Sequence, residues 1–214
     1  MNKEKFLIVG SGGRESAFAK KLSEDTELHA IMGHENPTII ENVLSTGGEY
    51  LVSNPNNPQE VSEYAQKHNI DYAFVSADEP LASGVIDALL EFNVKAVGGT
   101  KEATRIEWDK IYSIDLVNKV CPEFTPFYKV ASTVHEVDGI IEEFRKDNIQ
   151  VVVKPQGLTG GKGVKVMPEH LKTYEDAANY SKELLIKHPN EKVLIVEKLE
   201  GIEFTIMGLT DGEN

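Results

Sequence analysis

Residues 153–164 read Val-Lys-Pro-Gln-Gly-Leu-Thr-Gly-Gly-Lys-Gly-Val, a glycine-rich loop between two runs of β-branched residues. Glycine has no Cβ, so its backbone N–H groups can approach an anion closely. Lys154 and Lys162 can act as point charges on the terminal phosphates of a nucleotide. The Walker pattern is absent, because no Ser or Thr follows the Gly-Lys pair. We predict a strand, a loop and a second strand that form a flap over a nucleotide; a flexible hairpin with surface lysines is the alternative.

The composition is that of an ordinary globular protein with one large or two small domains: 214 residues, 40% hydrophobic and 27% charged. The net charge of −13 argues against nucleic acid as a partner, since proteins that bind it present basic surfaces. The one cysteine, Cys121, excludes an internal disulfide and suits a reducing compartment. No apolar run reaches about 18 residues, and the N-terminus enters a strand without a signal peptide. We expect a cytoplasmic protein that does not bind membranes.

Strand and helix signals alternate through residues 1–98, which predicts an α/β domain with a doubly wound parallel sheet. Continuous apolar runs that end in glycine are typical of buried parallel strands. An Asn-Pro pair at 57–58 provides a cap and a first helical residue. The predicted strands cover 6–9, 28–32, 50–52, 72–75 and 94–97, and the predicted helices cover 14–22, 57–68 and 81–92.

The pattern changes after a linker, residues 99–122, in which we expect helices over 100–107 and 109–119. A small α+β unit is predicted over 123–190, with strands 127–130, 150–154 and 164–167 and helices 133–146 and 173–187. Strands over 193–196 and 204–209 follow in a last segment, residues 191–214. That segment ends at an Asp-Gly turn from which no strand returns. We therefore expect a fragment cut at a hairpin, or a strand supplied by another molecule.

A second glycine-rich loop, Gly10-Ser-Gly-Gly-Arg-Glu15, joins the first strand to the first helix. Glycines at this place let the backbone approach an anion at the helix N-terminus. The dinucleotide fingerprint requires a third glycine where this chain has Glu15, so NAD binding has only weak support. Arg14 could hold a phosphate or a carboxylate, and a tight turn with Arg14 in solvent is the alternative.

Acidic residues suggest two further contacts. Asp78 and Glu79 follow the fourth strand at its C-terminal end, where ligands of such sheets bind. They could hold ribose hydroxyls or an amine, or equally favour the N-terminus of the next helix. Near the chain's other end, a strand edge at Glu197 could present backbone groups to an adenine, and Glu203 could accept bonds from both ribose hydroxyls. The six histidines show no spacing typical of a metal site.

Taken together, these motifs resemble the N-terminal half of the glycinamide ribonucleotide synthetases, a family of ATP-grasp enzymes of purine biosynthesis. The resemblance implies a pre-ATP-grasp domain over 1–98, an ATP-grasp small subdomain over 123–190 and an incomplete large subdomain over 191–214. The matching stretches are Gly10-Ser-Gly-Gly-Arg-Glu-Ser-Ala17, Asn36-Pro37, Asp78-Glu-Pro-Leu-Ala-Ser-Gly84, Gly98-Gly-Thr100 with Glu107 and Lys110, and Lys154 through Val164.

The resemblance also implies roles for individual residues, although it assigns no catalytic one. The implied ATP contacts are Lys110 and Lys154 on the phosphates, Gly160, Gly161, Lys162 and Gly163 in the flap, Glu197 and the backbone of Leu199 at the adenine, and Glu203 at the ribose. The implied phosphoribosylamine site contains Gly10, Gly12, Gly13, Arg14 and Asp78. Ser16 stands where the family usually has His, and Asp78 stands where it usually has the longer Glu.

In the implied reaction, ATP phosphorylates the carboxylate of glycine, and the amine of phosphoribosylamine attacks the acyl phosphate. In-line phosphoryl transfer needs a divalent metal, Mg²⁺ or Mn²⁺, whose ligands the resemblance places beyond Asn214. We therefore expect these residues to need the missing C-terminal half and, alone, to bind nucleotide weakly and be inactive or nearly so. Another ATP-grasp ligase, such as a carboxylase, and a non-catalytic nucleotide-binding module are the alternatives.

Overall fold

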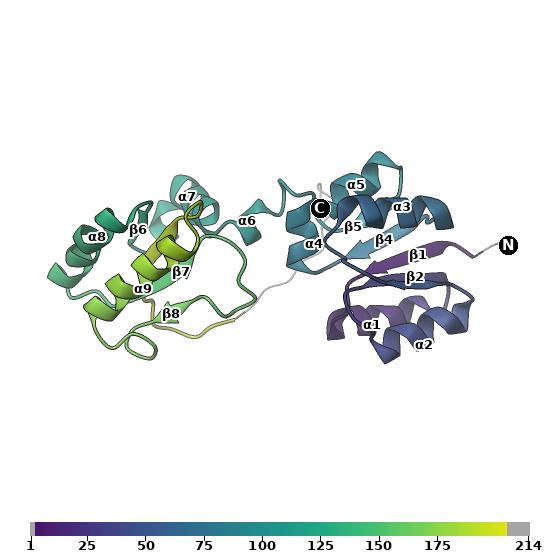
Figure 1. Cartoon of the computed structure of the whole chain (residues 1–214), viewed down its shortest axis with the longest axis horizontal. Helices are drawn as coiled ribbons and strands as arrows, with labels where there is room; N and C mark the ends of the chain where they lie inside the picture. The colour runs from purple at the N-terminus through teal and green to yellow at the C-terminus, as the bar shows by residue number, and fades with distance from the viewer. Residues whose placement is uncertain (1–2, 205–214) are drawn as a thin grey trace. The chain divides into compact units, whose positions relative to one another are not determined.

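The computed structural model describes residues 3–204 and divides into two compact units, Met1–Leu116 and Val117–Asn214 (Figure 1). The division falls inside helix α7 (Lys110–Val120), within the segment expected to link two domains. Each unit has its own sheet and its own hydrophobic core. In the part of the chain that is described, no helix is long and apolar enough to cross a membrane.

The first unit alternates strands and helices along the chain. Its strands are β1 (Lys5–Val9), β2 (Glu27–Met32), β3 (Tyr50–Val52), β4 (Tyr72–Val75) and β5 (Lys95–Val97), and its helices are α1 (Gly13–Leu22), α2 (Pro37–Thr46), α3 (Pro58–His68), α4 (Asp78–Ser83), α5 (Val85–Glu91) and α6 (Arg105–Trp108). The strands form one parallel sheet in the order β3-β2-β1-β4-β5. Helices α1 and α2 cover one face, and α3 and α5 cover the other (Figure 1). The predicted doubly wound parallel sheet is confirmed.

Successive side chains of each central strand point to opposite faces of the sheet, so the unit has two separate hydrophobic cores, one on each face. Leu7 and Val9 of β1 pack in a cluster with residues of α3 and α5. Ile8, between them, packs in a second cluster with residues of α1 and α2. All three side chains are fully buried. Because both faces are covered, the strand reads as a continuous apolar run, which is why the sequence identifies it.

Three helical stretches of this unit differ from the sequence prediction. Helix α2 was not expected, although Asn36 caps it by accepting from the N–H groups of Thr38 at 3.1 Å and Ile39 at 3.3 Å. The single helix predicted over 81–92 is wrong: α4 and α5 are separated at Gly84, whose φ of +89° is left-handed. The helix predicted over 100–107 is reduced to the short α6.

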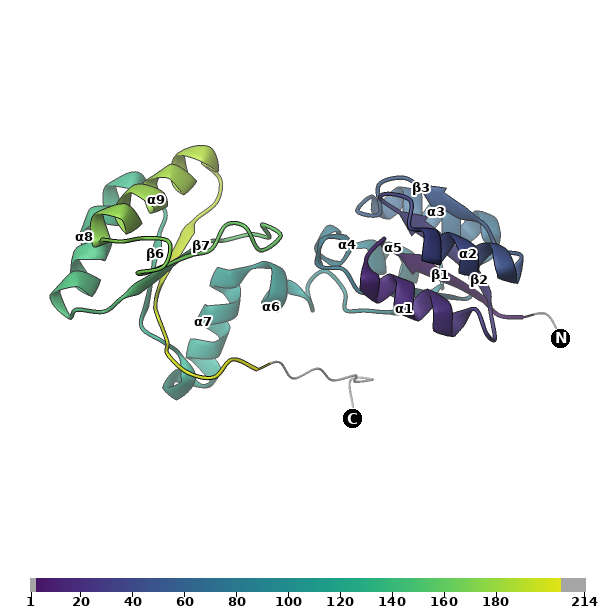
Figure 2. The ribbon, with the colours of Figure 1, turned by 90° about the horizontal axis from the view of Figure 1, so that it is seen from below.

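The second unit is built on an antiparallel sheet in the order β6-β9-β7-β8. It contains a 3₁₀ turn, η1 (Pro122–Phe124), helices α8 (Val134–Lys146) and α9 (Tyr174–Lys187), and strands β6 (Tyr128–Ala131), β7 (Val151–Pro155), β8 (Lys165–Val166) and β9 (Val193–Glu197). Figure 2 shows α8 and α9 side by side on the same face of this sheet. The predicted small α+β unit is confirmed.

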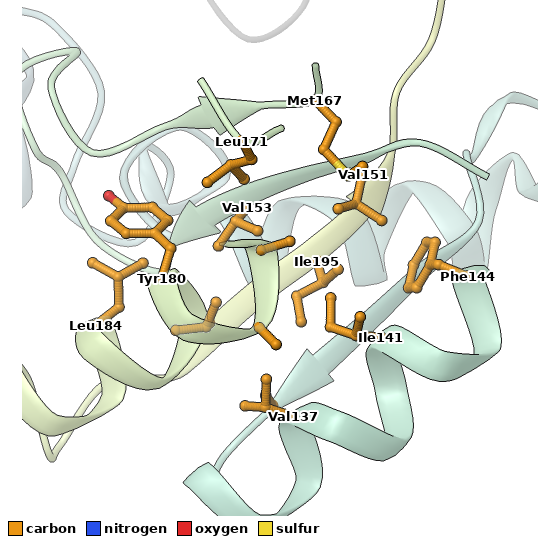
Figure 3. Packing of buried hydrophobic residues seen from close by; sticks show 14 of the residues in the cluster. Val137, Ile141, Phe144, Val151, Val153, Met167, Leu171, Tyr180, Leu184 and Ile195 are labelled. Carbon is orange, nitrogen blue, oxygen red and sulfur yellow. The ribbon is translucent and has the colours of Figure 1, made fainter. Parts of the chain in front are cut away.

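One apolar cluster joins the two helices of this unit to the sheet. Val137 and Phe144 of α8 and Leu184 of α9 pack against Val153 of β7 and Ile195 of β9 (Figure 3). Strand β9 therefore belongs to this sheet, and the boundary expected at residue 190/191 is corrected because it would divide the sheet. The strand predicted over 204–209 lies outside the described residues, apart from Phe204.

Candidate functional site

The predicted flap is present: β7 and β8 pair antiparallel, and residues 156–164 form the loop between them (Figure 2). At its tip, Gly160 and Gly161 have φ of +56° and +77°, which only glycine adopts readily. The N–H of Lys162 donates to the carbonyl of Thr159 at 3.2 Å and closes the turn. No atom lies within 4 Å of the Cβ positions at Gly160 and Gly161, so there is room for a side chain. Glycine is needed at these two positions because of the backbone conformation and not because of crowding.

Gly163, on the returning side of the loop, is required for a different reason. A Cβ there would lie 2.8 Å from the Pro155 ring and 2.9 Å from the side chain of Thr159. Contacts this short force the neighbours to move. The two sides of the loop therefore approach each other closely at Gly163, while the tip beyond Thr159 is open.

Lys154 lies on the face of the sheet opposite α8 and α9. Val151 and Val153 point into the cluster under the helices, so alternation places Lys154 on the other face, beside its partner Leu194. Burial lowers the pKa of Lys154, because an ammonium group loses hydration there. Within residues 3–204 no carboxylate is recorded in an ion pair with Lys154. A half-buried cation of this kind is suited to an anionic ligand.

The resemblance assigns Glu197 and Leu199 to the adenine and Glu203 to the ribose, and the structure places these residues at and beyond the end of β9. Glu197 is not at a sheet edge, since β9 lies between β6 and β7, and that expectation is wrong. Its carboxylate accepts from the N–H of Phe127 at 3.2 Å. Alternation from Ile195 places that side chain on the helix-covered face, away from Lys154. Leu199 and Glu203 are exposed beyond the strand.

Lys110, the second lysine expected at the phosphates, begins α7 and lies in the first unit. Its role as an ATP contact stays a prediction, as do the roles of Glu197, Leu199 and Glu203.

A separate pocket of about 280 Å³ lies in the first unit, between the loops that follow β1 and β4. Strand order reverses between these two strands, and open parallel sheets bind ligands at such a point. Four of the five residues that the resemblance assigns to phosphoribosylamine line this pocket, whereas Gly10 does not. It is lined by Gly12, Gly13, Arg14, Glu15, Ala77, Asp78 and Glu79.

Glu15, which stands where the dinucleotide fingerprint has a glycine, organises this pocket. It is 5% exposed, and its carboxylate accepts from the N–H of Gly12 at 2.9 Å and from the hydroxyl of Ser76. A Cβ at Gly10 would lie 2.9 Å from the Glu15 side chain, and one at Gly12 would lie 2.7 Å from it. The two glycines thus make room for Glu15, and the N–H of Gly12 is already occupied. An acid three residues after the helix cap was the signal that could have revealed this.

Arg14 and Asp78 are both exposed, and they line the pocket from different chain segments, after β1 and after β4. Arg14 donates to the carbonyl of Ser76 at 2.7 Å, which ties the first loop to the loop after β4. Ser16 donates to the carbonyl of Gly12 at 3.0 Å and accepts from Asn36 at 2.8 Å. The serine thus connects the first loop to the cap of α2, a contact that the sequence did not indicate.

Comparison with known proteins identifies both units. Residues 4–107 match the family model "Phosphoribosylglycinamide synthetase, N domain", and residues 108–214 match "Phosphoribosylglycinamide synthetase, ATP-grasp (A) domain". This chain belongs to the phosphoribosylglycinamide synthetase family. The resemblance given by its motifs is therefore confirmed, as is the ATP-grasp fold.

Individual members of the family agree. The phosphoribosylamine–glycine ligase of Methanopyrus kandleri is 40% identical over 215 residues, which cover 98% of this chain and 46% of the relative. The crystal structure of the Thermotoga maritima ligase has a TM-score of 0.65 at 25% identity and covers 92% of this chain and 44% of that one. This chain spans about half the length of the curated relatives that it matches.

The fold extends beyond the synthetase family. A biotin carboxylase domain from Hydrogenobacter thermophilus, in complex with MgADP and bicarbonate, has a TM-score of 0.63 at 15% identity. It covers 94% of this chain and 45% of that one, and at this identity it shows a shared fold alone.

Proposed function

We propose that this chain contains the nucleotide-binding flap and the phosphoribosylamine-binding pocket of an ATP-dependent ligase that joins glycine to 5-phosphoribosylamine. The observation that carries the proposal is Lys154, a half-buried ammonium group at the start of a glycine-rich flap, in a chain of the synthetase family. The products are glycinamide ribonucleotide, ADP and phosphate.

The flap and the lysine act on the triphosphate. Lys154 is already partly dehydrated, so it attracts a phosphate oxygen more strongly than a lysine in bulk water would. Lys162 is exposed at the tip of the loop and adds a second cation when the flap closes. The open N–H groups of the glycines can follow the oxygens. These groups orient the terminal phosphate toward the glycine carboxylate, and the acyl phosphate that forms is attacked by the amine.

In this proposal the pocket at Arg14 holds phosphoribosylamine. The guanidinium of Arg14 would bind the 5-phosphate, and the carboxylates of Asp78 and Glu79 would accept hydrogen bonds from the amine or a ribose hydroxyl. Gly13, exposed at the first turn of α1, can present its N–H to the same phosphate.

A divalent cation would neutralise charge on the transferring phosphoryl group. The resemblance assigns no ligand of Mg²⁺ or Mn²⁺ among residues 1–214. Residues 3–204 contain no group of three or more His, Cys, Asp or Glu side chains that could hold one. The residues described here therefore do not fit a metal site.

Calorimetric titration of the chain with ATP tests the proposal, with Lys154→Ala and a matched control. Lys129 of β6 is the control, because it is opposite Ile195 on the helix-covered face and pairs with Glu143 at 2.7 Å. We expect Lys154→Ala to weaken ATP binding about tenfold or more, the effect of losing one charge-assisted hydrogen bond. Lys129→Ala should bind within about twofold of wild type.

Equal ATP affinity in wild type and Lys154→Ala would refute the proposal, and so would an equal loss in both variants. NADH serves as the second ligand in the same titration. Tighter binding of NADH than of ATP would favour a dinucleotide-binding protein instead.

A further inference from the structure

The two sides of the flap loop are attached to different parts of the second unit. On the outgoing side, the N–H of Gln156 donates to the carbonyl of Lys192 at 3.2 Å, and the Gln156 side chain accepts from the N–H of Lys192 at 3.1 Å. On the returning side, the hydroxyl of Tyr180 in α9 donates to the carbonyl of Gly163 at 2.8 Å. Tyr180 thus connects a helix of the core to the base of the flap.

The Tyr180 ring is itself firmly held. It is 8% exposed and belongs to the cluster that contains Val153 and Leu184. Figure 3 shows the ring at the border of this cluster with its hydroxyl directed away from it. The ammonium group of Lys165 lies 3.7 Å from the ring centroid. Burial raises the pKa of Tyr180, so its hydroxyl keeps the proton that it donates.

The loop itself shows where the fixed part ends. Gly163 is packed against Pro155 and Thr159, whereas Gly160 and Gly161 have no atom within 4 Å of their Cβ positions. The hydrogen bond from Tyr180 therefore restrains Gly163, the closely packed residue that follows the open tip.

We propose that Tyr180 is a positioning residue that anchors the base of the flap, so that only residues 158–162 move when a nucleoside triphosphate binds. The inference depends on the proposed nucleotide-binding function. A fixed base reduces the number of residues that the ligand must order, and fewer ordered residues mean tighter binding. Tyr180 acts through Gly163 and does not need to touch the nucleotide.

Helix α9 offers a closely matched control in Tyr174. Its hydroxyl also donates to a backbone carbonyl, that of Ile149 at 3.1 Å, and a cation, Arg145, also lies over its ring at 5.5 Å. Ile149 precedes β7 and is not part of the flap. Tyr174→Phe and Tyr180→Phe therefore remove the same kind of bond from the same helix, but only one of those bonds holds the flap.

Limited proteolysis with trypsin measures the anchor without any nucleotide. Trypsin can cut after the exposed Lys162, next to Gly163, and mass spectrometry identifies that cut. The cleavage rate follows the population of the opened loop when opening is fast. We expect Tyr180→Phe to speed this cut about fivefold, the factor given by one ordinary hydrogen bond. Tyr174→Phe should change it less than about twofold, and both variants should keep the fold because the ring remains.

ATP affinity of the same three proteins completes the test. Tyr180→Phe should bind ATP about fivefold more weakly than Tyr174→Phe, because the ligand must then order a longer segment. Equal cleavage rates and equal affinities in the two variants would overturn the anchor. Faster cleavage of Tyr180→Phe in a chain that does not bind ATP would refute the proposed function but retain the anchor.

Discussion

Replacing Glu15 tests whether the first glycine loop is held by the chain's own carboxylate. Glu15→Ala removes the acceptor for the N–H of Gly12, at 2.9 Å, and for the hydroxyl of Ser76. It also empties the space that Gly10 and Gly12 leave for the side chain. Glu15→Gln keeps the shape, but its amide nitrogen cannot accept a hydrogen bond, so one of the two donors loses its partner.

The size of the effect follows from the two bonds. Each hydrogen bond to an ionised group contributes about 1.5–3 kcal/mol net, so two contribute about 3–6 kcal/mol. Moving a charged carboxylate out of water costs part of this. We therefore expect Glu15→Ala to lower the free energy of unfolding of the first unit by about 3–4 kcal/mol. Glu15→Gln should lower it by about half as much.

Urea unfolding followed by tryptophan fluorescence measures this change selectively. Trp108 is the chain's one tryptophan, and it lies in the first unit, where its indole donates to the carbonyl of Lys101 at 3.0 Å. Glu24→Ala is the control, because Glu24 is an exposed carboxylate that pairs with Lys21, and it should have no measurable effect. If Glu15→Ala were no more destabilising than Glu24→Ala, Glu15 would not hold the loop.

Four further outcomes are expected. Gly163→Ala would place a Cβ 2.8 Å from the Pro155 ring, so it should cost about 1–3 kcal/mol in thermal unfolding of the second unit. Gly139→Ala, in open space on α8, should instead stabilise that unit by about 0.4–1 kcal/mol. Burial lowers the pKa of Lys154, so ATP affinity should fall at alkaline pH in wild type but stay constant in Lys154→Arg, which remains charged; titrations across that pH range check this. Burial also lowers the pKa of His68 below 6.5, so the unfolded chain takes up this proton first, and the first unit should lose stability as pH falls below 6.5. His68→Phe should reduce that loss in urea unfolding monitored by fluorescence.

The sheets were predictable because their strands carry a strong local signal. Both faces of β1 are covered, so Leu7 and Ile8 sit in a continuous apolar run. The flap was predictable because glycines and lysines stand between two β-branched runs. The order in which strands pair within a sheet leaves no comparable pattern in the local sequence. Only the three-dimensional register shows that β9 lies between β6 and β7, which removes the expected edge at Glu197.

Helix α2 and the role of Glu15 show two different limits of sequence interpretation. The Asn36-Pro37 pair starts α2 as Asn57-Pro58 starts α3, so local spacing is sufficient to predict this helix. Glu15 is different, because its meaning comes from Ser76, a residue 61 positions away that the fold brings beside it. Side chains that act through such distant partners cannot be identified from local spacing.

The two glycine-rich loops show that similar sequence patterns can arise for different physical reasons. Gly12 lacks a side chain because the buried side chain of Glu15 fills the space that its Cβ would occupy, and Gly10 combines the same crowding with a φ of +133°. That loop is bonded to itself before any ligand arrives, so it can offer a pocket of fixed shape. Gly160 and Gly161 have left-handed φ values and no neighbours at their Cβ positions. Their loop has few contacts of its own at the tip, so a ligand must supply them. In the ligase proposed above this difference would be useful, because a preformed pocket would select the acceptor, while a flap ordered by the triphosphate would exclude water only after ATP is present.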